Sequence, residues 1–170
     1  IKGYDREFGI YRLGFPNREV EEGFMKFLLP YYANTDKVEA PFEVQKFVRE
    51  IRAGDYDSFF RRLQSFFADT TYEIIREQEL HYQNVLFVVF KLMGFYTNVE
   101  YRTSEGRIDL VLQTDKFIYV MEFKLDGTAE EALRQINEKH YAQPFAADSR
   151  KLFKIGVNSV SYTHLRAHET

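Results

Sequence analysis

The sequence lacks several features that would point to common classes of protein. It contains no cysteine, which excludes disulfide frameworks, thiolate metal sites and cysteine nucleophiles. No apolar run approaches the roughly 18 residues that span a bilayer. The first five residues, IKGYD, carry neither an initiator Met nor a signal-peptide pattern. We therefore expect a cytoplasmic protein without membrane contact, and a chain that is the C-terminal part of something longer.

The chain also lacks an excess of positive charge, because its formal net charge is -3 at pH 7. Any contact with nucleic acid must therefore come from a local basic patch. Hydrophobic residues make up 45% of the chain and aromatics 17%, which is enough for a packed core. A length of 170 residues has room for one compact domain with a short extension.

The last residues, 159–170 (SVSYTHLRAHET), show neither helix nor strand periodicity. They resemble the translation of a sequencing-library adapter; the alternative is an ordinary polar tail. We predict that this segment is foreign and not part of the fold. His164 and His168 have the i, i+4 spacing of a helical metal pair, which we discount for the same reason.

Residues 1–70 predict an α-helical lead-in. Residues 4–15 are expected to form a short β segment or a linker. Apolar stripes then indicate helices over about 18–29 and 41–53, and a third helix that begins at Asp55 or Asp57. Asn17 is suited to cap the first of these helices and Gly54 to end the second. The phenylalanines of these stripes are expected in the core.

Residues 71–158 predict the main domain, in the order helix, three strands, helix, strand. The first helix covers about 72–93, and Thr128 with Glu131 forms a capping-box pattern at the start of the second. Strands are expected over 97–102, 107–112, 117–123 and 150–157. This order is typical of an α/β domain, with a three-stranded antiparallel meander in a mixed central sheet that carries helices on both faces.

The hairpin between Arg107 and Lys124 carries the residues with chemical potential. If Asp115 and Lys116 form a two-residue turn, Thr114 pairs with Phe117, and the residue numbers of every pair along the hairpin add up to 231. Asp109 then lies directly opposite Glu122. Like charges so placed destabilise a hairpin unless a cation compensates them. Mg²⁺ takes oxygen ligands of this kind, and strand alternation puts Lys124 on the same face.

A metal beside an ammonium group suits phosphodiester hydrolysis, because both stabilise developing negative charge. The alternative is a plain ion pair between Glu122 and Lys124 at an exposed strand end, with Asp109 on a solvated edge. A three-residue turn would also break the exact opposition of the two carboxylates.

The blocks GRIDLVLQTDKFIYVMEFK and EEALRQINEKHYAQPF resemble the PD-(D/E)XK nuclease superfamily. Within it, they are similar to the domain at the C-terminus of bacterial AAA-ATPase-like proteins. The resemblance implies a restriction-endonuclease-like core, a Mg²⁺ (or Mn²⁺) cofactor, DNA as substrate and an upstream AAA-type ATPase domain as partner. Ile108 stands where the name-giving motif has Pro.

The resemblance also implies roles for individual residues. Catalytic roles fall on Asp109, Glu122, Lys124 and Gln135. Metal ligands would be Asp109, Glu122, the Phe123 carbonyl and Glu79. Without the resemblance, Glu79 is an ordinary exposed helix residue.

Several neighbours keep two interpretations. Gln135 and Lys139 share a helical stripe, which is either a solvated face or a reach towards the site, with Lys139 on a phosphate. Arg107 is either a nucleic-acid contact or an exposed cation. Tyr141 stacks on a base or fills the core, and His81 is expected on the helix surface or in the core rather than as a ligand.

The leading hypothesis is metal-dependent hydrolysis of phosphodiester bonds in DNA. A second is a nuclease fold that no longer cuts and instead binds DNA or a partner for the upstream ATPase. A third is a protein-interaction module that uses the Phe-rich helices of 18–67.

Overall fold

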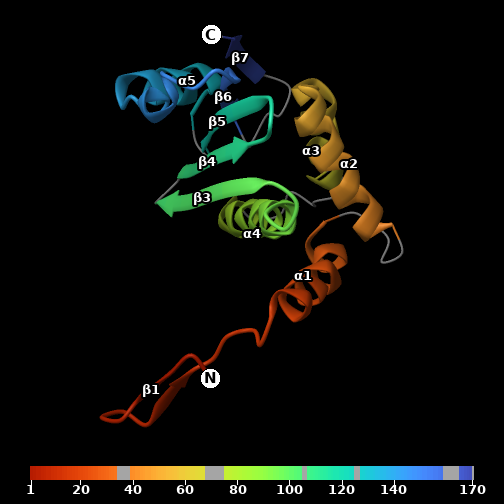
Figure 1. Ribbon diagram of the computed structural model, residues 1–170, viewed down its shortest axis with the longest axis vertical. Helices are drawn as coiled ribbons and strands as arrows, with labels where there is room; N and C mark the ends of the chain where they lie inside the picture. Colours follow the sequence, from red (N-terminus) through yellow and green to blue (C-terminus); the bar gives the residue numbers. More distant parts are fainter. Residues whose placement is uncertain (34–38, 68–74, 105–106, 125–126, 159–164, 170) are drawn as a thin grey trace.

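A computed structural model describes residues 1–33, 39–67, 75–104, 107–124, 127–158 and 165–169 (Figure 1). The side chains of 75–80, 101, 103, 104, 107, 108 and 165–169 lie outside this description. The helices are α1 (Arg18–Tyr32), α2 (Ala40–Ala53), α3 (Tyr56–Phe67), α4 (Ile75–Met93), α5 (Ala129–Glu138) and the 3₁₀ turn η1 (Gln143–Phe145). The strands are β1 (Gly3–Asp5), β2 (Ile10–Arg12), β3 (Asn98–Ser104), β4 (Arg107–Gln113), β5 (Phe117–Lys124), β6 (Lys151–Asn158) and β7 (Leu165–Glu169).

The main sheet has five strands in the order β3-β4-β5-β6-β7. Strands β3, β4 and β5 form an antiparallel meander, and β5 pairs in parallel with β6. Helix α5 makes the crossover between these two parallel strands, as parallel pairing requires. The predicted α/β class and mixed sheet are confirmed.

Local signals begin and end the lead-in helices where the sequence indicated. The Asn17 side chain accepts a hydrogen bond from the Val20 amide (2.9 Å) and caps α1. Gly54 ends α2 in the left-handed conformation with φ 82°, which favours glycine. Asp55 then accepts a hydrogen bond from the Ser58 amide (3.0 Å) at the start of α3. The boundaries differ from the predicted ones by a few residues at most.

Helices α1 to α4 build a large apolar cluster against one face of the sheet. From β5, the alternate side chains of Tyr119, Met121 and Phe123 enter this cluster. The Tyr119 hydroxyl donates a 2.8 Å hydrogen bond to the Ile51 carbonyl, which ties α2 to the sheet. The described phenylalanines of α2 and α3 other than Phe42 are buried here, so they serve the core as predicted.

Helix α5 covers the opposite face of the sheet over a much smaller apolar cluster. Its buried members are Ile118, Val120, Ile136 and Ala142. The predicted capping box is present, since Glu131 N donates to Thr128 Oγ1 and Thr128 N donates to Glu131 Oε2. The sheet thus carries helices on both faces, as expected.

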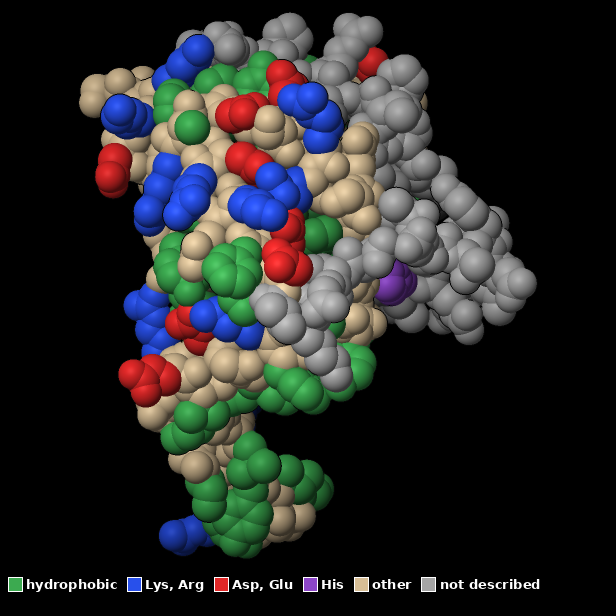
Figure 2. All heavy atoms as spheres, turned by 90° about the vertical axis from the view of Figure 1, so that its right-hand side faces the viewer, with side chains coloured by type: hydrophobic (Ala, Val, Ile, Leu, Met, Phe, Trp, Pro, Cys, Tyr) green, Lys and Arg blue, Asp and Glu red, His purple; other side chains and the backbone are tan. Residues whose placement is uncertain are grey.

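The β1–β2 hairpin projects from the end of α1, away from the sheet (Figure 1). Figure 2 shows hydrophobic side chains gathered on this projection, while Lys, Arg, Asp and Glu are interspersed above it. Exposed apolar side chains of this region are Ile1, Tyr4, Phe8, Ile10, Tyr11, Leu13, Val20, Phe24, Phe27 and Tyr31. The prediction that Phe24 and Phe27 lie in the core is wrong, because α1 turns Met25 and Leu29 towards the core instead.

The tail differs from the expectation that 159–170 would not belong to the fold. Its residues Leu165–Glu169 form β7, which pairs antiparallel with β6 from Val157↔Leu165 to Phe153↔Glu169. The physical reason is that β6 otherwise ends the sheet with unpaired backbone groups, which readily accept another strand. Residues 159–164 and 170 lie outside the described residues, and the adapter origin stays a prediction.

Candidate functional site

The register of the β4–β5 hairpin is the one that the sequence predicted. Thr114 N donates to the Phe117 carbonyl (2.8 Å), so Asp115 and Lys116 form the two-residue turn. Asp109 is therefore the direct partner of Glu122. Thr114 and Phe117 form a hydrogen-bonded pair, and such pairs alternate with non-hydrogen-bonded ones. Asp109 and Glu122 occupy a non-hydrogen-bonded pair, in which opposing side chains are closest.

Both carboxylates are withdrawn from solvent. Glu122 is 0% exposed and Asp109 is half-buried. One carboxylate oxygen of Asp109 and both of Glu122 are buried. Burying a charged carboxylate is costly unless a partner compensates for the lost hydration. The alternative of a solvated strand end is wrong for Glu122, because that side chain lies inside the protein.

Glu122 is buried where α5 approaches the sheet. Its partner on β6 is Gly156, and a Cβ there would lie 2.1 Å from the Ala129 carbonyl oxygen of α5. No side chain fits in that space, so glycine allows the first turn of α5 to lie directly on β6. The helix thereby covers the sheet beside Glu122.

Lys124 lies two residues beyond Glu122 on the same face and is half-buried. Its partner on β6 is Asn158, whose side-chain amide donates a 2.7 Å hydrogen bond to the Gly127 carbonyl. Asn158 thus ties the start of α5 to the strand ends beside Lys124. The structure brings Asp109, Glu122 and Lys124 together on one face.

The donor set of this face fits a hard divalent cation. Mg²⁺ is held in proteins by oxygen ligands, usually one or two carboxylates with waters completing the shell. Asp109 and Glu122 supply two facing carboxylates. Among the side chains that the structure describes, no cluster of three or more His, Asp or Glu is placed for metal binding. The fit to a divalent cation therefore rests on Asp109, Glu122 and their buried carboxylate oxygens.

The other predicted ligands are placed in part. Glu79 lies on α4, but its side chain is outside the described residues, as is that of Arg107 at the start of β4. The Phe123 ring enters the α4-side cluster. Phe123 pairs with Ile108 in the hairpin, and by the alternation of pairs its backbone groups, the carbonyl included, face Ile108 on β4. Their roles as ligands or contacts stay predictions.

Gln135 and Lys139 lie on and just beyond α5. Gln135 is half-buried, whereas Lys139 is exposed and forms the C-terminal cap of the helix. Helix α5 covers the face that carries the carboxylates, which keeps both residues on that side of the sheet. That they reach the site stays a prediction.

A groove beside Asp109 was not expected from the sequence. It encloses about 410 Å³ between the sheet and the segment that follows α5. Arg102, the direct partner of Asp109 on β3, stands at its rim. Applying the register arithmetic to the turn after Ser104 would have found this arginine. Tyr141 packs on the α5-side cluster and also lines the groove, so both interpretations of it apply.

The histidines take no described role as metal ligands. His81 is half-buried beside Phe67 and Tyr82, and burial lowers the pKa of its imidazole. This position agrees with the expected surface or core role. His168 lies on β7 with its side chain outside the described residues, and His164 lies outside them altogether.

The fold and the site together define a mixed α/β domain with two facing carboxylates and a lysine on one sheet face. The sequence profile of the PD-(D/E)XK nuclease superfamily matches residues 77–169, more than half of the chain. The chain belongs to this superfamily. The matched range covers α4 from residue 77 and every described element after it, β7 among them.

A curated relative comes from Azotobacter chroococcum mcd 1, where it is described as an uncharacterized protein in the vnfD 5'region. The two are 27% identical over 154 residues, which cover 86% of this chain and 30% of the relative. The chain therefore spans about a third of the length of the relative it matches. No solved structure matches the chain. Within the described residues, no helix is long and apolar enough to cross a membrane.

Proposed function

We propose that this protein hydrolyses phosphodiester bonds in DNA with a Mg²⁺ or Mn²⁺ cofactor. The observation that carries the proposal is the direct opposition of Asp109 and Glu122, one of them fully buried, with Lys124 following on the same face. Membership of a nuclease superfamily supports the same reaction class. A sheet with no such task has no physical reason to hold two facing carboxylates.

Each residue has a distinct role in this proposal. Asp109 and Glu122 hold the divalent ion, with the Phe123 carbonyl and Glu79 as further candidate ligands. The bound ion supplies a water of lowered pKa and a positive charge for the phosphate oxygens. The Lys124 ammonium would stabilise negative charge that develops on the phosphate, because Lys124 follows Glu122 on the same face of the sheet. Gln135 from α5 would orient the attacking water.

Cleavage of plasmid and linear DNA, with Mg²⁺ or Mn²⁺, tests the proposal. Asp109→Ala and Lys124→Ala should each reduce the cleavage rate by at least 100-fold, since each removes charge stabilisation in the transition state. Cleavage should also stop with EDTA. Wild-type cleavage without any effect of Asp109→Ala would contradict the assignment of the site.

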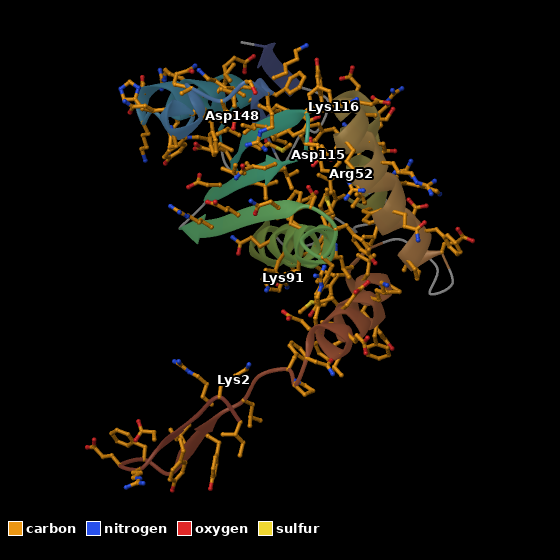
Figure 3. The ribbon with its side chains drawn as sticks, in the orientation of Figure 1. Lys2, Arg52, Lys91, Asp115, Lys116 and Asp148 are labelled. Atoms are coloured by element: carbon orange, nitrogen blue, oxygen red, sulfur yellow. The ribbon has the colours of Figure 1, made fainter. Side chains whose placement is uncertain are left out.

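The same hairpin supplies matched controls. Asp115 and Lys116 repeat the two residue types at the turn, about six residues from the site or roughly 20 Å along the strand. Figure 3 shows both at the end of the hairpin nearest α3. Asp115→Ala and Lys116→Ala should leave the cleavage rate within twofold of wild type.

The second candidate is a module that binds DNA without cutting it. Retained DNA binding with no cleavage under any divalent ion, in the full-length parent protein, would favour this function over hydrolysis. The full burial of the Glu122 carboxyl group is the observation that favours the catalytic function, because a silent module gains nothing from its desolvation cost.

We also propose an upstream AAA-type ATPase domain as the partner. Support comes from the exposed apolar side chains of the β1–β2 hairpin and α1, which suit an interdomain contact (Figure 2). The relative's greater length is compatible with a further domain. Lys139 and Arg107 are proposed contacts to the DNA backbone.

A further inference from the structure

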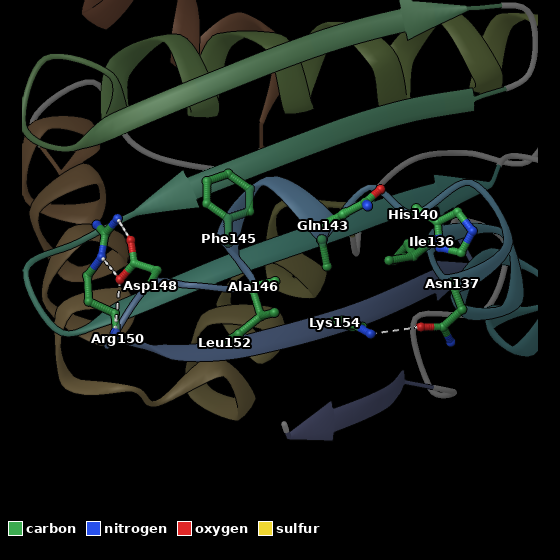
Figure 4. A pocket seen from close by; sticks show the side chains of 11 residues that line it. Ile136, Asn137, His140, Gln143, Phe145, Ala146, Asp148, Arg150, Leu152 and Lys154 are labelled. Atoms are coloured by element: carbon green, nitrogen blue, oxygen red, sulfur yellow. Dashed lines mark hydrogen bonds and ion pairs between the residues drawn. The ribbon is translucent and has the colours of Figure 1, made fainter.

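Two hollows lie on the α5 side of the sheet, separated by Phe145 and His140, which line both. The one beside β6, about 370 Å³, holds charged side chains that already have partners (Figure 4). Arg150 pairs with Asp148 at 2.6 Å, and Lys154 donates to the Asn137 side chain at 3.0 Å. Those contacts explain this cavity as part of the fold, whereas the groove beside Asp109 adjoins the candidate site itself.

The groove has an apolar floor. Val111 and Val120 contribute from the sheet, and Tyr141 and Phe145 from the segment after α5. Both aromatic side chains are half-buried, so each is anchored in the α5-side cluster and still lines the open space. Its volume of about 410 Å³ lies within the usual range for small-molecule sites, roughly 300–1,000 Å³.

The exposed charged groups of the lining, Arg102 and Glu100, stand at the rim, and Asp109 lies half-buried beside them. Arg102 and Asp109 are cross-strand partners, and Glu100 lies two residues before Arg102 on the same face. The Arg102–Glu100 ion pair is long, 3.9 Å, and both side chains are largely exposed. Such a pair contributes little, so the guanidinium can exchange Glu100 for a phosphate.

The backbone at the rim is unusual. His140 has φ 55°, the one described non-glycine residue with positive φ. A non-glycine residue in this conformation costs free energy and persists where the surrounding structure imposes it. The turn ends α5 there and brings Tyr141 and Phe145 over the sheet, because Gln143 N donates to the His140 carbonyl (2.9 Å).

From this arrangement we propose that the groove binds an unstacked nucleobase next to the phosphate cleaved at Asp109, so that single-stranded DNA is the preferred substrate. The inference rests on the proposed function. A phosphate alone is disfavoured in the groove by its apolar floor and by the carboxylates of Glu100 at the rim and of the half-buried Asp109 beside it. A base presents a flat apolar face that aromatic side chains can contact, and its own phosphate lies within the reach of Arg102.

A base inside a duplex cannot enter such a groove without leaving its stack, which costs a few kcal/mol. Single strands offer their bases without that cost. The position of the groove beside Asp109 therefore links strand preference to the chemistry, without any sequence-specific contact.

Binding measurements test this without requiring cleavage. The Lys124→Ala variant, in Mg²⁺, keeps both carboxylates and should not cut. We expect it to bind a single-stranded oligonucleotide at least tenfold more tightly than the duplex of the same sequence, by fluorescence anisotropy. A 2-aminopurine base in the single strand should lose fluorescence on binding, because stacking on an aromatic ring quenches it.

Substitutions in the groove should separate stacking from packing. Adding Tyr141→Leu should weaken single-strand binding by roughly 5- to 100-fold and abolish the quenching, the range expected for one stacked base. Tyr141→Phe should retain both. Phe87→Leu, an exposed aromatic on α4 at the other face, is the matched control and should change neither.

If Tyr141→Leu fails to fold, Arg102→Gln tests the groove instead. Arg102 is exposed and outside the core, so its substitution should not prevent folding. It should weaken single-strand binding about fivefold, while Lys91→Gln on α4 does not (Figure 3). Equal or tighter duplex binding, or equal effects of each variant and its control, would overturn the proposal. If the wild type does not cleave DNA but the groove variants still weaken single-strand binding as expected, only the proposed hydrolysis would be overturned.

Discussion

The two faces of the sheet differ in what they bury. The α4 face is packed by four helices and holds the larger apolar cluster. The α5 face is covered by one helix of ten residues over a cluster with four buried members, and α5 buries three more apolar side chains outside that cluster. On this second face lie Asp109, Glu122 and Lys124, the groove and the cavity beside β6.

This difference shows how a small domain can tolerate a costly site. Two facing carboxylates lower stability, and they lie on the face with the smaller apolar cluster. Apolar packing on the α4 face offsets the cost of the site. The strands that carry the carboxylates on the α5 face also turn their alternate side chains into the α4-side cluster. We therefore expect core substitutions on the α4 face to affect folding most, and polar substitutions on the α5 face to affect function most.

Truncation of one buried side chain on each face gives the largest expected effects. Leu92 on α4 and Ile136 on α5 are both fully buried. Leu92→Ala should lower the free energy of unfolding by about 4 kcal/mol, since densely packed neighbours cannot close the space. Ile136→Ala should cost about 2 kcal/mol, because it borders an open cavity. Urea unfolding monitored by circular dichroism measures both, and equal losses would contradict the difference between the faces.

Neutralising the buried carboxylate should have a smaller effect of opposite sign. Glu122→Gln removes like-charge repulsion with Asp109 and should raise the free energy of unfolding by about 1 kcal/mol without divalent ions. Mg²⁺ should raise the melting temperature of the wild type by binding the folded state, and should no longer do so in the variant. Asp115→Asn, at the turn, controls for general charge effects. A variant that is less stable than wild type without Mg²⁺ would contradict this account.

Much of the fold could be predicted because local chemistry specifies it. Alternation gave the faces of β5, turn length gave the Asp109–Glu122 register, and Asn17, Gly54 and Thr128 marked helix ends. One prediction that failed concerned Phe24 and Phe27, which stay exposed on α1. Another concerned β7, where a polar segment with no strand periodicity pairs with β6. That pairing depends on the free edge of a neighbouring strand, which periodicity within the segment does not reveal.

Only the part of the candidate site that depends on the register of the β4–β5 hairpin could be predicted from the sequence. The groove depends on the path of the chain after α5, which turns at His140 in a conformation that histidine rarely adopts. Arg102 was within reach of the same register arithmetic through β3. The burial of Glu122 depends on the close approach of α5 at Gly156, a contact between residues far apart in sequence.

The smallest expected effect concerns the ion pair that fixes the end of the α5 face opposite the site. Arg150 donates to Asp148 (Figure 4). It also donates to the Thr114 carbonyl (2.9 Å) and to the Gln113 side chain (3.1 Å), so it joins the start of β6 to the β4–β5 turn. Hydrogen bonds from Arg150 lower the pKa of Asp148 from 3.8 to about 2.

A lowered pKa in the folded state stabilises the protein above the unfolded value, and the contribution is lost as the pH falls. The melting temperature of the wild type should therefore exceed that of Asp148→Asn above about pH 4 by a small margin, which disappears between pH 4 and pH 2. Thermal melts of both proteins across this range measure the margin, with Asp57→Asn on α3 as the control. A constant margin down to pH 2 would mean that the pair adds nothing through its charge. The α5 face would then depend on apolar contacts at this end, as the α4 face does throughout.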